Sequence, residues 1–169
     1  MVYMKADKSL MTYSPRTGKI MKLPSSMLMQ GWMGTDAQFD NILGAASLSQ
    51  DFTHSYQGKK TVNGQECHLI RCVPKPATPV AYDHVDAYLS VQNDTWVRLV
   101  FFDKKGTVSQ QMDALHFKRF DGVLMPDEIR FTAKDGNQTT TLTILEWRKR
   151  PDLKPSWFSE STMKNMDSL

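Results

Sequence analysis

The side chains that could do acid–base, nucleophilic or metal chemistry are scattered along the chain. They are four histidines, two cysteines and an Asp-His-Val-Asp run at 83–86. That run is more typical of a solvated strand edge than of a metal site or an acid–base pair, and neither a Gly-x-Ser-x-Gly nor a His-Glu-x-x-His motif occurs. No residue stands out as a nucleophile or general base. We therefore expect a protein that is not an enzyme and has no cofactor and no bound metal.

The sulfur-containing residues support the same expectation. Cys67 and Cys72 fall in one expected strand, where about 3.3 Å per residue separates their Cα atoms by roughly 16 Å and puts them on opposite faces, so they cannot bridge each other. Met27, Met29 and Met33 could attract a soft metal such as Cu(I), but no cysteine or histidine lies near them in the sequence to complete a site. The methionine side chains could also form a flexible wall for acyl chains, or they could belong to an ordinary hydrophobic core.

Length and charge limit the classes of partner. The chain has 169 residues, enough for one domain with a sizeable core, and its net charge is 21 − 18 = +3 without a basic block. We therefore expect no nucleic-acid partner. No apolar run approaches the ~18 residues of a membrane span, and the first ten residues lack the apolar core of a signal peptide. We expect a soluble chain whose export signal, if it has one, is not in this sequence.

Strands must position whatever site exists, because turn signals recur between segments rich in Val, Thr, Phe, Tyr and Ile. These signals are Asn63-Gly64, Asn93-Asp94, Lys105-Gly106, Asp121-Gly122 and Asp135-Gly136. The segments between them alternate apolar and polar residues, as in Ile129 and Phe131 against Arg130. Helix is expected only over 36–43, with Asp36 as the N-cap, and in a short turn near Ser156.

About nine or ten strands with one apolar face must curl or close, so we expect a mainly β fold with a single curved antiparallel sheet forming an open half-barrel. Little helix is available to fill it, and part of the concave face could hold a ligand. The alternative is a barrel filled by its own side chains. Alternation predicts these cavity residues: Leu89, Val91, Leu99, Phe101, Leu115, Phe117, Ile129 and Phe131.

The stretch from Gly31 to Leu43 has two interpretations. It could be a loop and short helix packed over the sheet, with glycines supplying unusual backbone angles. It could also be a movable lid hinged at its glycines, with its aromatic residues over the cavity. The predicted lid residues are Gly31, Trp32, Met33, Gly34, Asp36 and Phe39.

The order of these motifs resembles the bacterial outer-membrane lipoprotein-sorting proteins, similar to LolA and LolB. The most specific pieces are the Gly-x-Met-Gly-Thr-Asp box at 31–36, the run from Gly58 to Cys67, and the Asp-Gly-x-x-x-Pro turn ending at Pro126. Family members usually carry an aromatic residue where this chain has Ala37. The resemblance covers residues 1–169 as one domain, apparently shortened at its N-terminus. It implies a half-barrel with a helical lid and a periplasmic carrier or receptor of acylated lipoproteins or lipids.

Two functional hypotheses follow. The first is a lipid-chain carrier that exchanges its cargo with membrane partners, such as an inner-membrane transporter. The second is an envelope protein-interaction domain that uses the same groove or a sheet edge. An exposed edge also predicts a homodimer.

Overall fold

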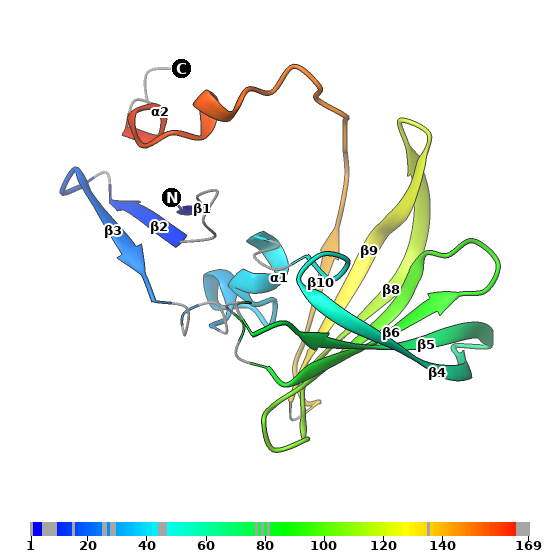
Figure 1. Ribbon diagram of the computed structural model, residues 1–169. Coiled ribbons are helices and arrows are strands. Elements are labelled where there is room, and N and C mark those ends of the chain that lie inside the picture. Colours follow the sequence, from blue (N-terminus) through cyan, green and yellow to red (C-terminus); the bar gives the residue numbers. More distant parts are fainter. Residues whose placement is uncertain are drawn as a thin grey trace.

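The computed structural model describes residues 2–4, 10–14, 16–24, 27, 30–43, 47–76, 78, 80, 82–134 and 136–164. The described strands form two antiparallel sheets, of three and seven strands. The prediction of one continuous sheet is wrong, because the strands before residue 24 pair only among themselves. The half-barrel prediction is confirmed: the larger sheet is curved and does not close (Figure 1).

The larger sheet has the order β10-β9-β8-β7-β6-β5-β4, so every strand pairs with its neighbour in the sequence. Its strands are β4 (Phe52–Val62), β5 (Gln65–Pro74), β6 (His84–Ser90), β7 (Trp96–Phe102), β8 (Val108–Phe120), β9 (Val123–Ala133) and β10 (Thr139–Thr143). Bulges interrupt four of the six ladders. Bulges increase local twist and bend strands, which suits a sheet that must curl.

The predicted hairpin signals lie where the strands reverse. Asn63 and Gly64 have φ of 52 and 79 and join β4 to β5, and Asp121 and Gly122 join β8 to β9 with φ of 44 and 78. Two successive positive φ values define the two-residue turn that matches strand twist. Gly106 lies between β7 and β8, and Gly136 between β9 and β10, whereas Asp135 is outside the described residues.

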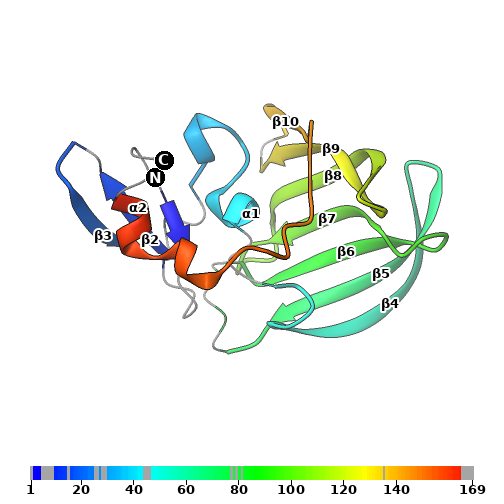
Figure 2. The same cartoon turned by 90° about the horizontal axis from the view of Figure 1, so that it is seen from above.

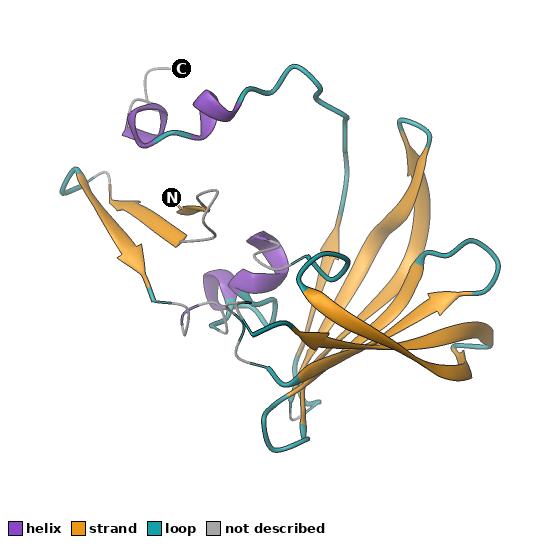
Figure 3. Cartoon of the chain, viewed as in Figure 1, coloured by secondary structure: helices purple, strands orange, loops and turns teal. Residues whose placement is uncertain are grey.

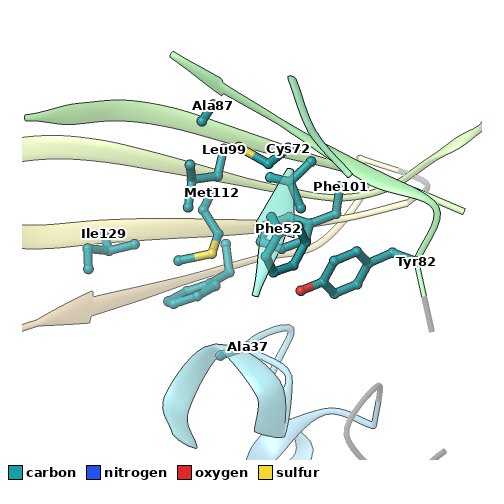
Figure 4. Packing of buried hydrophobic residues seen from close by; sticks show 11 residues of the cluster. Ala37, Phe52, Cys72, Tyr82, Ala87, Leu99, Phe101, Met112 and Ile129 are labelled. Carbon is teal, nitrogen blue, oxygen red and sulfur yellow. The ribbon is translucent and has the colours of Figure 1, made fainter. Parts of the chain in front are cut away.

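The main core lies on one face of this sheet. Its buried residues alternate along β5 to β9 and meet Ala37 of the 31–43 segment, as Figure 4 shows. The cluster consists of Ala37, Phe52, Cys72, Tyr82, Val85, Ala87, Leu99, Phe101, Met112, Ile129 and Phe131. On the opposite face, polar pairs run between strands: Arg71 binds Asp86 at 2.8 Å, and Arg98 binds Asp113.

The smaller sheet consists of β1 (Val2–Met4), β2 (Leu10–Ser14) and β3 (Lys19–Leu23). Figures 1 and 2 both place it apart from the larger sheet, near the C-terminal helix α2 (Glu160–Lys164). The turn η3 (Pro155–Phe158) precedes α2, close to the predicted Ser156. Between the sheets lie η2 (Trp32–Gly34) and α1 (Phe39–Leu43), so helix is scarce, as predicted (Figure 3).

Candidate functional site: a cavity on the concave face

An apolar cavity of about 510 Å³ opens on the core face of the larger sheet. This volume falls within the range of about 300–1,000 Å³ that is typical of small-molecule sites. The lining residues come from both ends of the sheet: Leu48, Ser49, His54, Ile70, Cys72, Ala87, Leu89, Asp94, Thr95, Trp96, Leu99, Leu124, Met125 and Pro126. Because β4 and β9 contribute to one cavity although four strands separate them, the sheet must curl around it.

The cavity is apolar inside and polar at its rim. Cys72, Ala87 and Leu99 line its floor and are buried in neighbouring strands. Burial also raises the pKa of the Cys72 thiol to about 11, so the thiol is neutral at ordinary pH and adds to the apolar floor. The exposed lining residues, Ser49 and Asp94 among them, are polar and lie where solvent enters.

The strands themselves explain the floor. On β5, β6 and β7, residues that face one another across the ladders share a face, as Cys72 with Val85 and Ala87 with Leu99. Ala87 is the small residue in this group, and a small side chain at the centre of a concave sheet leaves room above it. At the rim of the cavity, the Leu48 carbonyl lies 2.7 Å from His54 Nε2, and this contact ties the turn before β4 to that strand.

The 31–43 segment is a closed loop rather than an extended strap. A β-bridge pairs Gly31 with Gln38, the Trp32 N–H donates to the Ala37 carbonyl at 2.6 Å, and the Phe39 N–H donates to the Gln30 carbonyl at 3.1 Å. Thr35 Oγ1 also donates to the Trp32 carbonyl at 2.7 Å. The first two hydrogen bonds form the bridge and close the loop around the Gly-Trp-Met-Gly-Thr-Asp box, and the Thr35 hydroxyl adds a third inside it.

The two glycines of the box are needed for different reasons. Gly34 has φ of 79, a left-handed conformation that glycine adopts readily. Gly31 has an ordinary φ of −60, but a Cβ there would lie 2.2 Å from the Thr35 carbonyl oxygen. Gly31 therefore permits close backbone approach, and its role as a hinge has no support in its dihedral angles.

Asp36 fastens this loop to the sheet. Its carboxylate accepts a hydrogen bond from Thr140 Oγ1 at 2.9 Å, and its carbonyl accepts one from Gln110 Nε2 at 2.7 Å. The prediction that Asp36 caps the short helix is wrong, because α1 begins three residues later and the Asn41 side chain accepts from the Gln38 N–H. The Asp36 carboxylate instead accepts its hydrogen bond from Thr140 of β10.

A second buried polar contact lies beneath α1. The Tyr82 hydroxyl donates to the Asp40 carboxylate, and Asp40 is only 8% exposed. Burial raises the pKa of Asp40 above its ordinary value of 3.8, although the bond from Tyr82 opposes the shift. Burial and the neighbouring carboxylate raise the pKa of Tyr82 as well, so the tyrosine stays neutral as a donor.

The predicted cavity residues divide into three groups. Leu89 and Leu99 line the cavity, with Leu99 also part of the core cluster, whereas Phe101, Ile129 and Phe131 pack in that cluster alone. Val91, Leu115 and Phe117 are half-buried and lie in neither set of described residues. Val91 follows the end of β6, and Leu115 falls in a bulge of β8, where the alternation that placed it is broken.

None of the predicted lid residues whose side chains are described lines the cavity. Trp32 and Phe39 are half-buried but line neither the cavity nor the core cluster, and the Met33 side chain lies outside the described residues. Ala37 supplies the apolar contact instead, at 3% exposure. This small residue fits under a loop that approaches the sheet closely.

Sequence reasoning missed most of the cavity wall. Leu124, Met125 and Pro126 lie at the start of β9, just after the Asp121-Gly122 turn, and Leu48 belongs to the turn before β4. The curvature of the sheet brings these residues to the cavity, and apolar–polar alternation within a strand does not predict that curvature. Alternation also missed Trp96, because its position has the opposite parity to Leu99 in the same strand and only a bulge in the ladder pairs it with Leu89.

The described residues contain no group of three or more His, Cys, Asp or Glu side chains arranged to hold a metal ion. Within the same residues, none of the helices has the length and apolar character required to cross a bilayer.

Solved structures share this fold. The chain is similar to an outer-membrane lipoprotein-sorting protein domain from Vibrio parahaemolyticus, with a TM-score of 0.78, 15% identity and coverage of 92% of this chain and 66% of that chain. A DUF1329 family protein from Desulfovibrio piger gives a TM-score of 0.79 at 17% identity, covering 91% and 64%. A LolA superfamily protein from Nitrosomonas europaea gives 0.67 at 15% identity, covering 92% and 68%.

The chain thus spans about two thirds of the length of these structures. No curated protein matches it by sequence. A family model whose description reads "-like: Uncharacterized protein" matches residues 1–165, and the chain belongs to that family, with a LolA-like fold.

Proposed function

We propose that this chain binds the acyl chains of lipids or lipoproteins in its concave cavity and carries or receives them in the periplasm. The observation that supports this most directly is the cavity itself, with a buried apolar floor at Cys72, Ala87 and Leu99 and polar groups only at the rim. The likeness to a lipoprotein-sorting domain supports the same class of cargo.

The energetics suit reversible transfer. Each buried methylene gains about 0.8 kcal/mol, so about ten methylenes gain roughly 8 kcal/mol, comparable to a micromolar complex before ordering costs. Such a ligand leaves when a partner offers similar burial. We propose that this partner is a membrane protein such as an inner-membrane transporter, or an outer-membrane acceptor.

Mass spectrometry of protein purified under native conditions tests this function. We expect the wild-type chain to retain lipid after exposure to a bacterial lipid extract, and Leu89→Trp, which fills the cavity, to lose it. Leu145→Trp is the matched control, because Leu145 is 85% exposed and lies outside the cavity lining. Wild-type protein that holds no lipid, or equal retention by Leu89→Trp, would count against a carrier.

The second candidate is a protein-interaction domain, favoured by one observation about the sheet edges. At one end, β4 carries Lys59, Lys60 and a bulge, features that discourage strand addition. At the other end, β10 presents the uncharged run Thr139–Thr143. This edge suits an added strand, from another envelope protein or from a second copy in a homodimer.

Light scattering separates these possibilities. A dimer that Thr141→Lys converts to monomer, in lipid-free protein, would favour edge pairing. A monomer at high protein concentration would rule out the homodimer.

A further inference from the structure

The cavity rim has an uneven charge. Of the lining residues, Asp94 is the one with a permanent charge at neutral pH, and neither lysine nor arginine is among the described residues that line the cavity. The other polar members are the hydroxyls of Ser49 and Thr95 and the imidazole of His54. A ligand whose tail occupies the floor must leave its polar end against this rim.

The Asp94 carboxylate is uncommitted, unlike other carboxylates of the sheet. Arg71 holds Asp86, Arg98 holds Asp113 and Lys134 holds Asp103. Within the described part of the chain, by contrast, the Asp94 carboxylate makes no hydrogen bond and no ion pair.

The backbone holds Asp94 in place at the rim. Its φ is 57, and its N–H donates to the Ser90 carbonyl at 3.0 Å. The next residue is fixed as well, because both the N–H and the hydroxyl of Thr95 donate to Asn93 Oδ1. A carboxylate on a tight turn is therefore positioned before any ligand arrives, which limits the ordering cost of using it.

Given the proposed function, on which this step rests, we infer that the cavity selects lipids whose polar end donates hydrogen bonds and is neutral or cationic, and that Asp94 sets this preference. A carboxylate accepts hydrogen bonds and donates none. A free fatty acid or a phosphate would bring a second negative charge to a rim that offers no lysine or arginine partner. An acylglycerol hydroxyl or an alkylammonium group would instead satisfy Asp94.

Three amphiphiles with one twelve-carbon chain and different polar ends test the inference: dodecylammonium, dodecanoylglycerol and dodecanoate. Near neutral pH the first is cationic and the last anionic, since their ordinary pKa values are about 10.4 and 4.3. Trp96 lines the cavity and reports binding by fluorescence once Trp32, Trp147 and Trp157 are replaced by Phe. At low ionic strength we expect dodecylammonium to bind on the order of tenfold tighter than dodecanoate, with dodecanoylglycerol between them.

Asp94→Asn should bring the three dissociation constants within about twofold of one another, as should about 1 M salt, which screens exposed charges. Asp152→Asn is the matched control, because Asp152 pairs with Arg150 away from the cavity and its loss changes the net charge equally. The order of affinities should survive in that variant.

Several outcomes would overturn the inference: dodecanoate binding as tightly as dodecylammonium, a preference that persists in Asp94→Asn, or one that Asp152→Asn also removes. Those results would leave the carrier function standing. If none of the three amphiphiles changes Trp96 fluorescence, both the carrier function and the preference are wrong.

Discussion

The concave face of the larger sheet has two halves that differ in what covers them. In one half, Phe101, Met112 and Phe131 pack against Ala37, and the loop is fastened by Asp36. In the other half, Leu89 and Trp96 line an open cavity. Both halves are built from the same strands with the same apolar alternation.

The difference shows that alternation fixes which face is apolar, whereas the covering segment decides whether that face becomes core or cavity. The 31–43 loop reaches one half because three polar groups anchor it there, on Gln110, Thr140 and Tyr82. The described residues that line the other half include none from this loop. The loop is therefore better described as a clamp over the core than as a lid over the cavity.

The largest expected effect on stability comes from removing a large side chain from the covered half. Phe131 is 1% exposed, so Phe131→Ala should lower the free energy of unfolding by about 3–5 kcal/mol. Urea denaturation measures this. Leu145→Ala, at an exposed position, should change it by less than about 0.5 kcal/mol. Equal effects would mean that Phe131 is not packed as described.

Opening the clamp should have the next largest effect. Gly31→Ala places a Cβ against the Thr35 carbonyl, which must move and break neighbouring bonds, at a cost of about 1–3 kcal/mol. Amide hydrogen exchange at Trp32 should then accelerate. Gly34→Asn is the control, since asparagine tolerates positive φ and a Cβ there meets no atom within 4 Å. Unchanged exchange in Gly31→Ala would contradict the close approach.

Filling each half should separate stability from binding. Met112→Trp overpacks the covered half and should cost about 1–3 kcal/mol. Leu89→Trp enters open space and should cost less than about 0.5 kcal/mol, while lipid retention is lost. Urea denaturation and native mass spectrometry together measure this pair. A large loss of stability in Leu89→Trp would show that the second half is filled as well.

The smallest expected effect is a pH dependence at the clamp. Because burial raises the pKa of Asp40 in the folded chain, the folded state binds its proton more tightly than the unfolded state. Its contribution to stability is complete below the unfolded pKa of 3.8 and is lost as pH rises through the raised folded pKa. Asp40→Asn should remove this decline, measured as urea midpoints between about pH 4 and 8. An unchanged pH profile would rule out Asp40 as its source.

The strands and hairpins were predictable because local rules govern them. Asn63-Gly64 and Asp121-Gly122 adopt turns that their residue types favour, and alternation placed Leu89 and Leu99 on the concave face. The rest depends on contacts distant in sequence. The Asp36 carboxylate accepts a hydrogen bond from Thr140, which lies 104 positions away in the sequence, and a bulge displaces Leu115. Residue spacing could therefore predict neither this bond nor the position of Leu115.

Quenching of single tryptophans by a brominated acyl chain tests the central difference between the halves most directly. Trp96 lines the cavity, whereas Trp32 belongs to the clamp and lies outside the lining. In chains that keep one tryptophan each, the brominated chain should quench Trp96 saturably and leave Trp32 unchanged. Equal quenching of both, or quenching of Trp32 alone, would contradict this account, because the acyl chain would then lie under the 31–43 segment.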